Sequence, residues 1–374
     1  METFVTIKSI QAFVYRAPIA KPVRTSFGLM LNRPAVFVRI EDQDGVIGWG
    51  EVWCNFPSCG AEHRAILLEE TFKPLLINEK FTQPQEIYQL LTKKTEVLAI
   101  QSGEYGPIAQ VCAGLDLAAW DLFAKKSQLP LWRYLGGNSP SIKTYASGIN
   151  PDHPEQVVEQ FLDNGYNAFK LKIGFGDAID HQNLKNIRTV IPDHLLMVDA
   201  NQVWDVSEAL EKIQALQEFH LNWIEEPIRA DLALEDWRRL AVNSHARLAA
   251  GENIVGQKNF TDAIQSGAFA VIQPDVAKWG GISGCLPIIQ MLEGRSIEYC
   301  PHYLGGGIGL LASAHLLAAS GSQGMLEIDS NPNPLRSLAG SPIEHIIEGM
   351  VTLTEELGIG LEPNLDELAQ FRIH

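Results

Sequence analysis

Charged and titratable residues recur along the middle of the chain at a nearly constant interval. The gaps between neighbours are 23 to 27 residues, and the series is Lys172, Asp199, Glu225, Glu252, Asp275, His302 and Glu327. One strand, one helix and two loops occupy about this length, which is the repeat of a β/α barrel. The spacing therefore predicts that each side chain lies at the same end of a different strand, so that all of them share one mouth.

Carboxylates in this series are candidates for binding a metal ion. Asp199, Glu225 and Glu252 supply hard, anionic oxygen atoms from consecutive repeats. Such ligands suit Mg²⁺, whose remaining positions are filled by water or substrate. Glu226 directly follows Glu225 and competes with it as the ligand from that strand.

Short apolar runs that alternate with helical patterns are expected to position these residues. We expect strands at 144–147, 168–173, 195–199, 223–225, 247–250, 271–273, 297–300 and 325–328. Near-continuous apolar strands separated by helices are typical of a parallel sheet that helices cover on the outside. The pattern predicts an α/β fold that closes into a barrel, and active sites of such barrels lie at the carboxyl ends of the strands.

The first part of the chain has a different pattern. Turn residues at 42–45 separate two short apolar runs, which predicts a hairpin over 35–51. Helical periodicity follows at 64–76 and at 110–126. These features predict an α+β domain ahead of the barrel.

A cluster of glycine, asparagine, serine and proline at 136–140 marks the passage from the first domain to the barrel. Beyond residue 342 we expect another helix and then a short tail. The expected division of the chain is an N-terminal α+β capping domain at 1–128, a barrel with the catalytic site at 129–345, and a C-terminal segment at 346–374 that packs back toward the capping domain.

Composition and charge exclude several classes of function. The chain has 374 residues, of which 46% are hydrophobic, so it can form two domains and bury at least one large core. The formal net charge is -16 and no run of Lys and Arg offsets it, so we expect neither nucleic acid nor a membrane surface as a partner. Without a signal-like or membrane-spanning apolar stretch, we expect a cytoplasmic protein.

Cysteine and glycine patterns offer weaker signals. The cysteines, which are Cys54, Cys59, Cys112, Cys285 and Cys300, lack paired CxxC spacing and are expected to be reduced, structural thiols. The glycine-rich run 305–309 follows the seventh expected strand, where many barrels bind phosphate, so a phosphate ligand is an alternative. A non-catalytic barrel is a further alternative, although every expected ligand and base is present.

The order and spacing of the motifs resemble the enolase superfamily, in its mandelate racemase branch. The matching motifs are Phe169-Lys170-Leu171-Lys172, Val198-Asp199-Ala200-Asn201, Trp223-Ile224-Glu225-Glu226-Pro227, Gly251-Glu252-Asn253, Gln273-Pro274-Asp275, Lys278-Trp279-Gly280-Gly281, Pro301-His302 and Leu326-Glu327. The resemblance covers essentially the whole chain. It implies a modified TIM (β/α)7β barrel with an N-terminal α+β capping domain.

The resemblance also implies roles for the site residues. One Mg²⁺ ion would bind to Asp199, Glu252 and the first glutamate of the pair, Glu225. In the KxK motif, Lys170 would contact the substrate carboxylate and Lys172 would act as a base. For that role the ammonium must be destabilised, and we expect Lys170 and the metal to lower the pKa of Lys172.

The remaining matched residues complete the expected site. The carboxylate of Asp275 would orient His302 and raise the basicity of its imidazole on the opposite face of the substrate. Glu327 would form a hydrogen bond with the substrate carboxylate or an enediolate oxygen, and Asn201 is a further candidate for substrate binding. His315, in an apolar helix over 310–319, is expected to be a packing residue.

The implied reaction begins with removal of a proton α to a carboxylate, which requires stabilisation of the resulting enediolate. If Lys172 and His302 exchange that proton across the plane, the product is an epimer; if one abstracts it and the other protonates a departing β-hydroxyl, the product is a 2-keto acid. The runs 172–176 and 327–336 resemble members that act on sugar acids and their lactones. Dehydration of an acid sugar is therefore our first expectation, with racemisation, epimerisation or lactone cycloisomerisation as alternatives.

Substrate choice is expected to depend on the capping domain. In the family, two N-terminal loops close over the barrel mouth, and the matching segments here are 21–32 and 53–60. Arg24 could pair with an anionic distal group, while the walls would include Trp53, Asn55 and Phe56. The expected partner is a small hydroxy carboxylate, and the resemblance implies a homo-oligomer.

Overall fold

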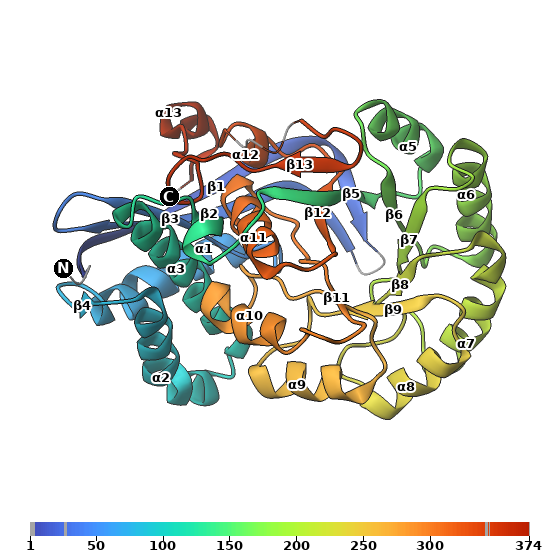
Figure 1. The fold of residues 1–374 in the computed structure, drawn as a ribbon, viewed down its shortest axis with the longest axis horizontal. Helices are drawn as coiled ribbons and strands as arrows, with labels where there is room; N and C mark the ends of the chain where they lie inside the picture. Colours follow the sequence, from blue (N-terminus) through green and yellow to red (C-terminus); the bar gives the residue numbers. More distant parts are fainter. Residues whose placement is uncertain (1–3, 26–27, 341–342, 344, 374) are drawn as a thin grey trace.

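The structure, a computed structural model, describes residues 4–25, 28–340, 343 and 345–373. An N-terminal unit of strands and helices lies beside a ring of strands that is surrounded by helices (Figure 1). Ser26 and Phe27, within the expected capping loop 21–32, lie outside the described residues, as do residues 1–3, 341, 342, 344 and 374 of the expected domains.

The N-terminal unit is an antiparallel sheet packed against helices. Its described strands pair in the order β3-β2-β1-β4, with β1 Val5–Thr25, β2 Gly28–Asp42, β3 Ile47–Val52 and β4 Lys80–Phe81. Its helices are α1 Gly60–Leu67, α2 Pro84–Ser102 and α3 Tyr105–Lys126. The predicted hairpin corresponds to β2 and β3, and an α+β domain comes first as expected.

The sequence patterns did not predict β1 or α2, whereas the helix expected at 64–76 is found, as α, π and 3₁₀ turns that run from Gly60 to Leu75. Its α-helical part, α1, ends at Leu67 and continues as a π-helical turn at Leu68–Phe72. The prolines of β1 coincide with a register shift against β2 between Pro18 and Val23, because proline cannot donate a ladder hydrogen bond. They also interrupt the alternation of apolar and polar residues by which a strand is recognised in a sequence.

The second unit is an almost closed barrel of parallel strands. Pairing among the described strands runs β11-β10-β9-β8-β7-β6-β5-β12. The bounds are β5 Ser141–Ile149, β6 Ala168–Lys172, β7 Leu195–Asp199, β8 Trp223–Glu225, β9 Arg247–Ala250, β10 Val271–Ile272, β11 Glu298–Tyr299 and β12 Met325–Asp329. The fold class predicted from the sequence is confirmed, and strand ends differ from the expected ones by three residues or fewer.

Helices follow the strands and cover the outside of the barrel, as the ring from α5 to α9 shows in Figure 1. They are α5 Pro154–Asp163, α6 Asp177–Val190, α7 Val206–Ala215, α8 Leu234–Asn243, α9 Gln257–Ser266, α10 Gly281–Gln290 and α11 Gly307–Ser320. Helices α10 and α11 lie between the barrel and the N-terminal unit (Figure 1). Two short helices flank the barrel strands in the sequence: α4 Leu131–Tyr134 precedes β5, and α12 Pro334–Ser337 follows β12.

The chain beyond residue 342 differs from the expected helix. It contains the strand β13 Met350–Thr352, which pairs antiparallel with β5. Among its described residues it also contains the short helix α13 Leu365–Leu368, which a 3₁₀ turn at Ala369–Phe371 follows. The final residues contact the N-terminal unit: Ile373 N donates to Val14 O at 2.9 Å, and Trp49 Nε1 donates to Glu362 Oε2 at 2.8 Å.

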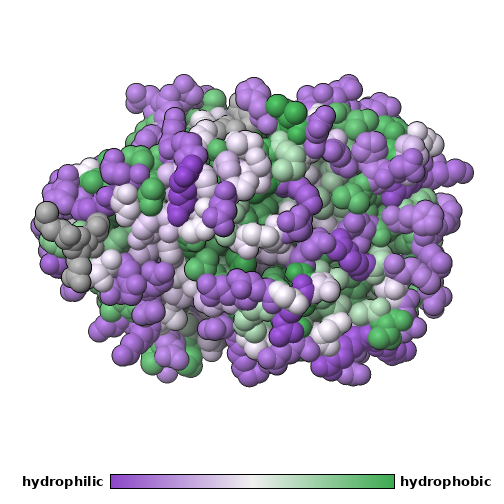
Figure 2. Space-filling model, in the orientation of Figure 1, coloured by the Kyte–Doolittle hydropathy of each residue, from purple (hydrophilic) through white to green (hydrophobic). Residues whose placement is uncertain are grey.

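Polar residues cover much of the face drawn in Figure 2, with apolar residues interspersed among them. The main apolar core joins the barrel strands to their helices, and a separate cluster fills the N-terminal unit. Among the described residues, no helix is both long and apolar enough to cross a membrane.

Candidate active site

Lys170 and Lys172 extend from β6 into the barrel. Their neighbour Leu171 packs in the apolar core instead, as alternation along a strand requires. Lys170 Nζ lies 2.6 Å from Glu225 Oε2 and 2.8 Å from Glu327 Oε1. Lys172 stands opposite Asp199 in the β6–β7 register, and their side chains form an ion pair. Both lysines are therefore buried among carboxylates at the barrel mouth.

The three expected metal ligands come from neighbouring strands. Asp199 ends β7 and is paired in register with Glu225, which ends β8, while Glu252 follows the end of β9. Their hard oxygen atoms fit Mg²⁺ in type. Among the described residues, however, no group of three such side chains is gathered closely enough to hold a metal ion as it stands. Each carboxylate instead contacts a cationic side chain.

Burial and mutual repulsion affect two glutamates of this region. Burial, and then the Asp199 carboxylate, raise the pKa of Glu225 to about 7 against the attraction of Lys170. Burial, Glu252 and Asp199 raise the pKa of Glu226 well above its usual value. Such a concentration of buried carboxylates favours binding of cations.

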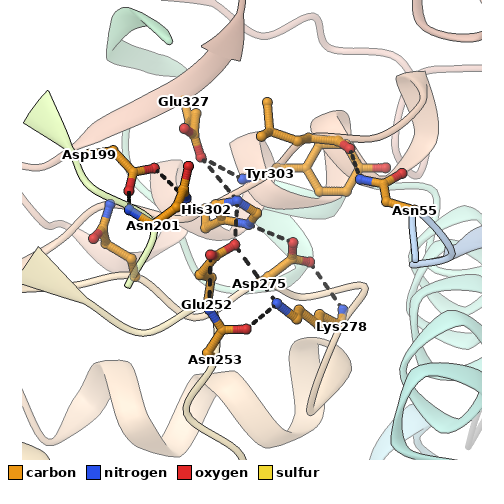
Figure 3. A network of polar contacts seen from close by, with 12 residues as sticks. Asn55, Asp199, Asn201, Glu252, Asn253, Asp275, Lys278, His302, Tyr303 and Glu327 are labelled. Atoms are coloured by element: carbon orange, nitrogen blue, oxygen red, sulfur yellow. Dashed lines mark hydrogen bonds and ion pairs between the residues drawn. The ribbon is translucent and has the colours of Figure 1, made fainter. Parts of the chain in front are cut away.

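His302 lies between carboxylates at the centre of the mouth (Figure 3). Its Nδ1 is 2.8 Å from Asp275 Oδ2, and its Nε2 is 2.8 Å from Glu252 Oε2. Burial lowers the pKa of His302, but Glu252 and Glu327 outweigh it and raise the pKa well above 6.5. Both ring nitrogens can donate only in the imidazolium form, so this arrangement favours a protonated His302.

Glu327 joins the lysine side of the mouth to the histidine side. Its Oε1 accepts from Ser147 Oγ and lies by Lys170, while its Oε2 accepts from Tyr303 N at 2.9 Å. His302 Nε2 is 3.9 Å from the same Oε2. Burial raises the pKa of Glu327, but Lys170 and His302 bring it down to about 2. Glu327 is therefore an anion in this arrangement.

Asn201 and Asn253 hold carboxylates of the site in place (Figure 3). Asn201 donates from its backbone N to Asp199 Oδ1 at 2.8 Å and from its amide to Asp199 Oδ2 at 3.0 Å. Asn253 Nδ2 donates to Glu226 Oε2 at 2.8 Å and to Glu252 Oε1 at 2.9 Å. Asn201 thus lies at the site, where its amide contacts a carboxylate.

The lowering of the pKa of Lys172 that is expected with a bound ion stays a prediction. Burial and the Lys170 ammonium do lower it, but the Asp199 carboxylate outweighs them and raises the pKa above its usual value. The expectation placed the charge of Asp199 on a metal ion, whereas here that charge faces the lysine directly.

Residues of the N-terminal unit reach the barrel mouth from two segments. Arg24, on β1, places its guanidinium 5.2 Å from the centre of the Phe175 ring, and its backbone N donates to Asn150 Oδ1 at 3.2 Å. Lys278 Nζ lies 4.9 Å from the centre of the Trp53 ring. Phe56 packs near Trp53, with ring centroids 6.4 Å apart.

The glycine-rich run 305–309 has a different role from the phosphate site considered above. Gly306 N and Gly309 N donate to the carboxylate of Glu51 at 2.6 Å and 2.9 Å. A Cβ atom at Gly306 would stand 2.8 Å from Glu51 Oε1, so glycine is needed for this approach. The structure argues against a phosphate at these two amides, because a carboxylate already occupies them.

Other expectations can be located as well. The five cysteines are free thiols, and Cys300 packs at the base of the barrel with Met197 and Trp223. His315 is buried; its Nδ1 accepts from Trp132 N at 3.0 Å, and its Nε2 faces Ile359 O at 3.2 Å. The packing role expected for His315 is confirmed.

Some contacting residues were missed at the sequence level. Ser147, Gln273 and Tyr303 all touch Glu225 or Glu327, through hydrogen bonds from Ser147 Oγ, Gln273 Nε2 and Tyr303 N. Each lies at or just beyond the carboxyl end of a barrel strand. A rule that examined every polar strand-end residue, rather than charged ones alone, would have found them.

Comparison with known proteins places the chain in a family. Residues 154–368 match the family described as enolase C-terminal domain-like, and residues 9–136 match the mandelate racemase / muconate lactonizing enzyme N-terminal domain. A D-galactarolactone cycloisomerase from Agrobacterium fabrum is 29% identical and covers 91% of this chain and 92% of its own length. An arabinonate dehydratase from Saccharolobus solfataricus is 28% identical over 87% of each chain.

Solved structures agree with these relatives. A mandelate racemase/muconate lactonizing enzyme from Bordetella bronchiseptica is 47% identical, with a TM-score of 0.93 and coverage of 98% of this chain and 99% of that one. An enolase from Bradyrhizobium in complex with magnesium and mandelic acid is 28% identical, with a TM-score of 0.88 and 100% coverage of both chains. The relatives include lyases, isomerases and epimerases. The chain is an enzyme of the enolase superfamily and belongs to its mandelate racemase and muconate lactonizing enzyme family.

Proposed function

We propose that this enzyme abstracts the α-proton of a hydroxy carboxylate with the help of Mg²⁺, and that it dehydrates an acid sugar to a 2-keto-3-deoxy acid. The observation that carries the proposal is the placement of two basic side chains around one set of buried carboxylates. Lys172 contacts Asp199 on one side of the mouth, and the His302–Asp275 pair contacts Glu252 on the other.

Asp199, Glu225 and Glu252 would hold the ion, in agreement with the magnesium present in the Bradyrhizobium relative. When bound, Mg²⁺ would polarise the substrate carboxylate and offset the second negative charge that develops on it. Glu225 and not Glu226 is proposed as the ligand from β8, since Asn253 binds both oxygens of Glu226.

In the proposed dehydration, the chain's own groups move protons at two carbon atoms. Neutral Lys172 Nζ takes the proton from C2, and the electron pair forms the enediolate. The bond from C3 to its hydroxyl then breaks as His302 Nε2 donates a proton, so the hydroxyl leaves as water. The resulting enol takes up a proton at C3 and loses the proton of its C2 hydroxyl, which gives the 2-keto acid.

Other residues of the site would orient the substrate. Lys170 is proposed to bind the carboxylate oxygen, and Glu327 to form a hydrogen bond at the same end. Asp275 would hold the imidazole through Nδ1, the nitrogen from which it lies 2.8 Å away. Asn201 is proposed to fix Asp199 and to contact substrate from the same loop.

Arg24 and Trp53 are proposed to read the distal end of the substrate. Arg24 faces the loop after β6, since its guanidinium lies over Phe175. An aldaric acid carries a second carboxylate that could pair with this cation, whereas an aldonic acid carries none. Trp53 contacts Lys278 beside Glu252 and so borders the same mouth.

A second candidate is isomerisation of a related acid or its lactone. The cycloisomerase from Agrobacterium fabrum favours it, because that relative is similar to this chain over 91% of its residues. The same pair of bases would serve, with proton return to the α-carbon in place of loss of the β-hydroxyl.

The test is incubation of the purified protein and Mg²⁺ with aldonic acids, aldaric acids and their lactones in deuterated water. Dehydration predicts a 2-keto acid from at least one compound. Deuterium at the α-carbon of recovered acid without any keto acid would favour racemisation or epimerisation, and consumption of a lactone alone would favour cycloisomerisation. Absence of all these products from every compound would reject the proposed function.

A further inference from the structure

Two loops carry the His302–Asp275 pair, and each leads directly into a barrel helix. Asp275 lies ahead of α10, and its Oδ1 accepts from Ala277 N at 2.9 Å and from Lys278 N at 3.0 Å. His302 lies ahead of α11, whose first turn holds Gly307 to Gly309. The position of each helix N-terminus therefore constrains the loop that bears one member of the pair.

The first of these helices is capped by a carboxylate of the N-terminal unit. Asp116, on α3, is fully buried; its Oδ2 accepts from Ser283 N at 2.9 Å and its Oδ1 from Ser283 Oγ at 2.6 Å. Ser283 lies in the first turn of α10. A Cβ atom at Gly281 would stand 2.3 Å from Asp116 Oδ2, so this glycine admits the carboxylate.

The second helix is capped in the same way. Glu51, at the end of β3, is 2% exposed, and its carboxylate accepts from Gly306 N and Gly309 N at the start of α11. A buried carboxylate on the free N–H groups of a helix N-terminus gains from charge-assisted hydrogen bonds and from the helix dipole. The capping domain thus supplies one buried carboxyl group to each of the two helices.

Backbone contacts from the same part of the capping domain reinforce both anchors. Trp53 N donates to Ala277 O at 3.1 Å, within the loop of Asp275. Asn55 Nδ2 donates to Leu304 O at 2.7 Å, two residues beyond His302 (Figure 3). Segment 51–55 therefore touches both loops, and its Asn55 amide is engaged with the barrel rather than directed only at a ligand.

We propose that Glu51 and Asp116 are positioning residues, which hold the loops of His302 and Asp275 in register from the capping domain. The proposal rests on the proposed function in so far as these two residues form the catalytic pair. Neither carboxylate contacts His302 or Asp275 directly, so both act through backbone. The packing of the capping domain on the barrel would then have a second role besides substrate recognition. It would set the distance between His302 and the carboxylate of Asp275.

A matched control is present on the same helix as Asp116. Asp121 is also fully buried, and it accepts from Ile359 N at 2.7 Å and from Trp49 N at 2.8 Å. Its Oδ2 also lies 2.9 Å from Lys125 Nζ, on the same helix. These amides belong to the C-terminal segment and to β3, away from both loops of the pair. Asp121→Asn should therefore weaken the fold without disturbing the pair.

The experiment compares Glu51→Gln, Asp116→Asn and Asp121→Asn in the full-length protein, using hydrogen exchange read by mass spectrometry. Local opening is reported by exchange whether or not a substrate is known. We expect Glu51→Gln to speed exchange at 302–312, Asp116→Asn to speed it at 275–290, and Asp121→Asn to speed it at 357–362. Unchanged exchange at 302–312 in Glu51→Gln together with unchanged exchange at 275–290 in Asp116→Asn would overturn the proposal.

The second measurement is kcat and KM with whichever acid the wild-type enzyme turns over. We expect Glu51→Gln and Asp116→Asn to lower kcat by on the order of 10- to 100-fold, with KM changed by less than about threefold. Asp121→Asn should keep kcat. Equal losses of kcat in all three variants would show that Glu51 and Asp116 only stabilise the fold, and this result would overturn the proposal. If the wild type turns over no acid, the proposed function fails, while the exchange comparison still decides whether these carboxylates hold the loops.

Discussion

Two sets of buried carboxylates in this enzyme face different kinds of partner. At the barrel mouth, Asp199 and Glu252 face the side chains of Lys172 and His302, which can exchange protons and can move. In the capping domain, Glu51, Asp116 and Asp121 each accept a hydrogen bond from a backbone N–H group distant in the sequence. Ser283 Oγ also donates to Asp116, and Lys125 Nζ lies 2.9 Å from Asp121 Oδ2. Asp199 is as deeply buried as the capping-domain set, while the side chain of Glu252 is 15% exposed, so burial alone does not mark a catalytic carboxylate. The partner distant in the sequence separates the two sets: it is a basic side chain at the mouth and a backbone N–H group in the capping domain.

Loss of a base should give the largest effect and would test the barrel side of the comparison. We expect Lys172→Ala and His302→Asn each to lower kcat by on the order of 10³-fold or more, because general acid–base groups contribute about 10²- to 10⁴-fold and these two act together. Turnover of the acid identified for the wild type measures the change, with circular dichroism as the control for folding. A variant with near wild-type kcat would remove that residue from the pair of bases.

Removal of the ion should abolish activity as well. We expect protein treated with EDTA to lose turnover and to regain it on addition of MgCl₂, because the enediolate requires a cation to offset its charge. Activity assays before and after addition of the ion measure this. Undiminished activity without the ion would show that Asp199, Glu225 and Glu252 are not metal ligands.

Two adjacent glutamates, one at the end of β8 and one directly after it, allow a sharper test of the metal site. Glu225 and Glu226 are both buried, and Lys170 faces the first while Asn253 faces the second. We expect Glu225→Gln to weaken Mg²⁺ binding by on the order of 100-fold, and Glu226→Gln, the matched control, by about tenfold or less. Titration calorimetry with MgCl₂ measures both. The reverse order would make Glu226 the ligand.

His315 extends the comparison to a buried group that faces backbone. Burial lowers its pKa from 6.5 to about 4. Between these two pH values, therefore, His315 is protonated in the unfolded chain and neutral in the folded chain. Its contribution to the free energy of unfolding is complete above pH 6.5 and should be lost as pH falls toward 4, by roughly 3 kcal/mol in total. Urea unfolding from pH 7 to pH 4.5, in wild type and His315→Gln, measures the difference between their pH slopes.

The buried acids Glu51 and Asp116 act in the opposite direction, since burial raises the pKa of each to about 7 and their stabilising contribution is lost as pH rises. Comparison with His315→Gln removes this background, because both proteins share it. Parallel slopes for the two proteins would mean that His315 titrates normally in the folded state.

Arg24 should give the smallest effect. We expect Arg24→Ala to raise KM for an aldaric acid by about 2- to 5-fold, because an exposed ion pair contributes no more than about 1 kcal/mol, and to leave KM for the matching aldonic acid unchanged. Steady-state kinetics with the two acids measures this. An equal change for both acids would show that Arg24 does not read a distal carboxylate.

Much of the barrel and its mouth was predictable from sequence. The regular spacing of Lys172, Asp199 and Glu225 follows from the barrel repeat, and all three do lie at strand ends. The roles of these residues rest on the resemblance and on the tests above.

Other features were beyond the reach of sequence patterns. The hydrogen bond from Gly306 N to Glu51 joins residues 255 positions apart, and that from Ser283 N to Asp116 spans 167. The residues next to Glu51 and Asp116 form no motif that would indicate contact with a helix N-terminus far away in the sequence. The pKa of Lys172 likewise depends on whether Asp199 faces the lysine or an ion, which no local sequence pattern indicates.

The most direct test of the central claim is proton NMR of the α-carbon of sugar acids in deuterated water. The wild-type enzyme with Mg²⁺ should exchange the C2 proton of at least one aldonic or aldaric acid or convert that acid to a 2-keto acid, and the double variant Lys172→Ala/His302→Asn should do neither. Exchange or conversion by the double variant at the wild-type rate would contradict the account.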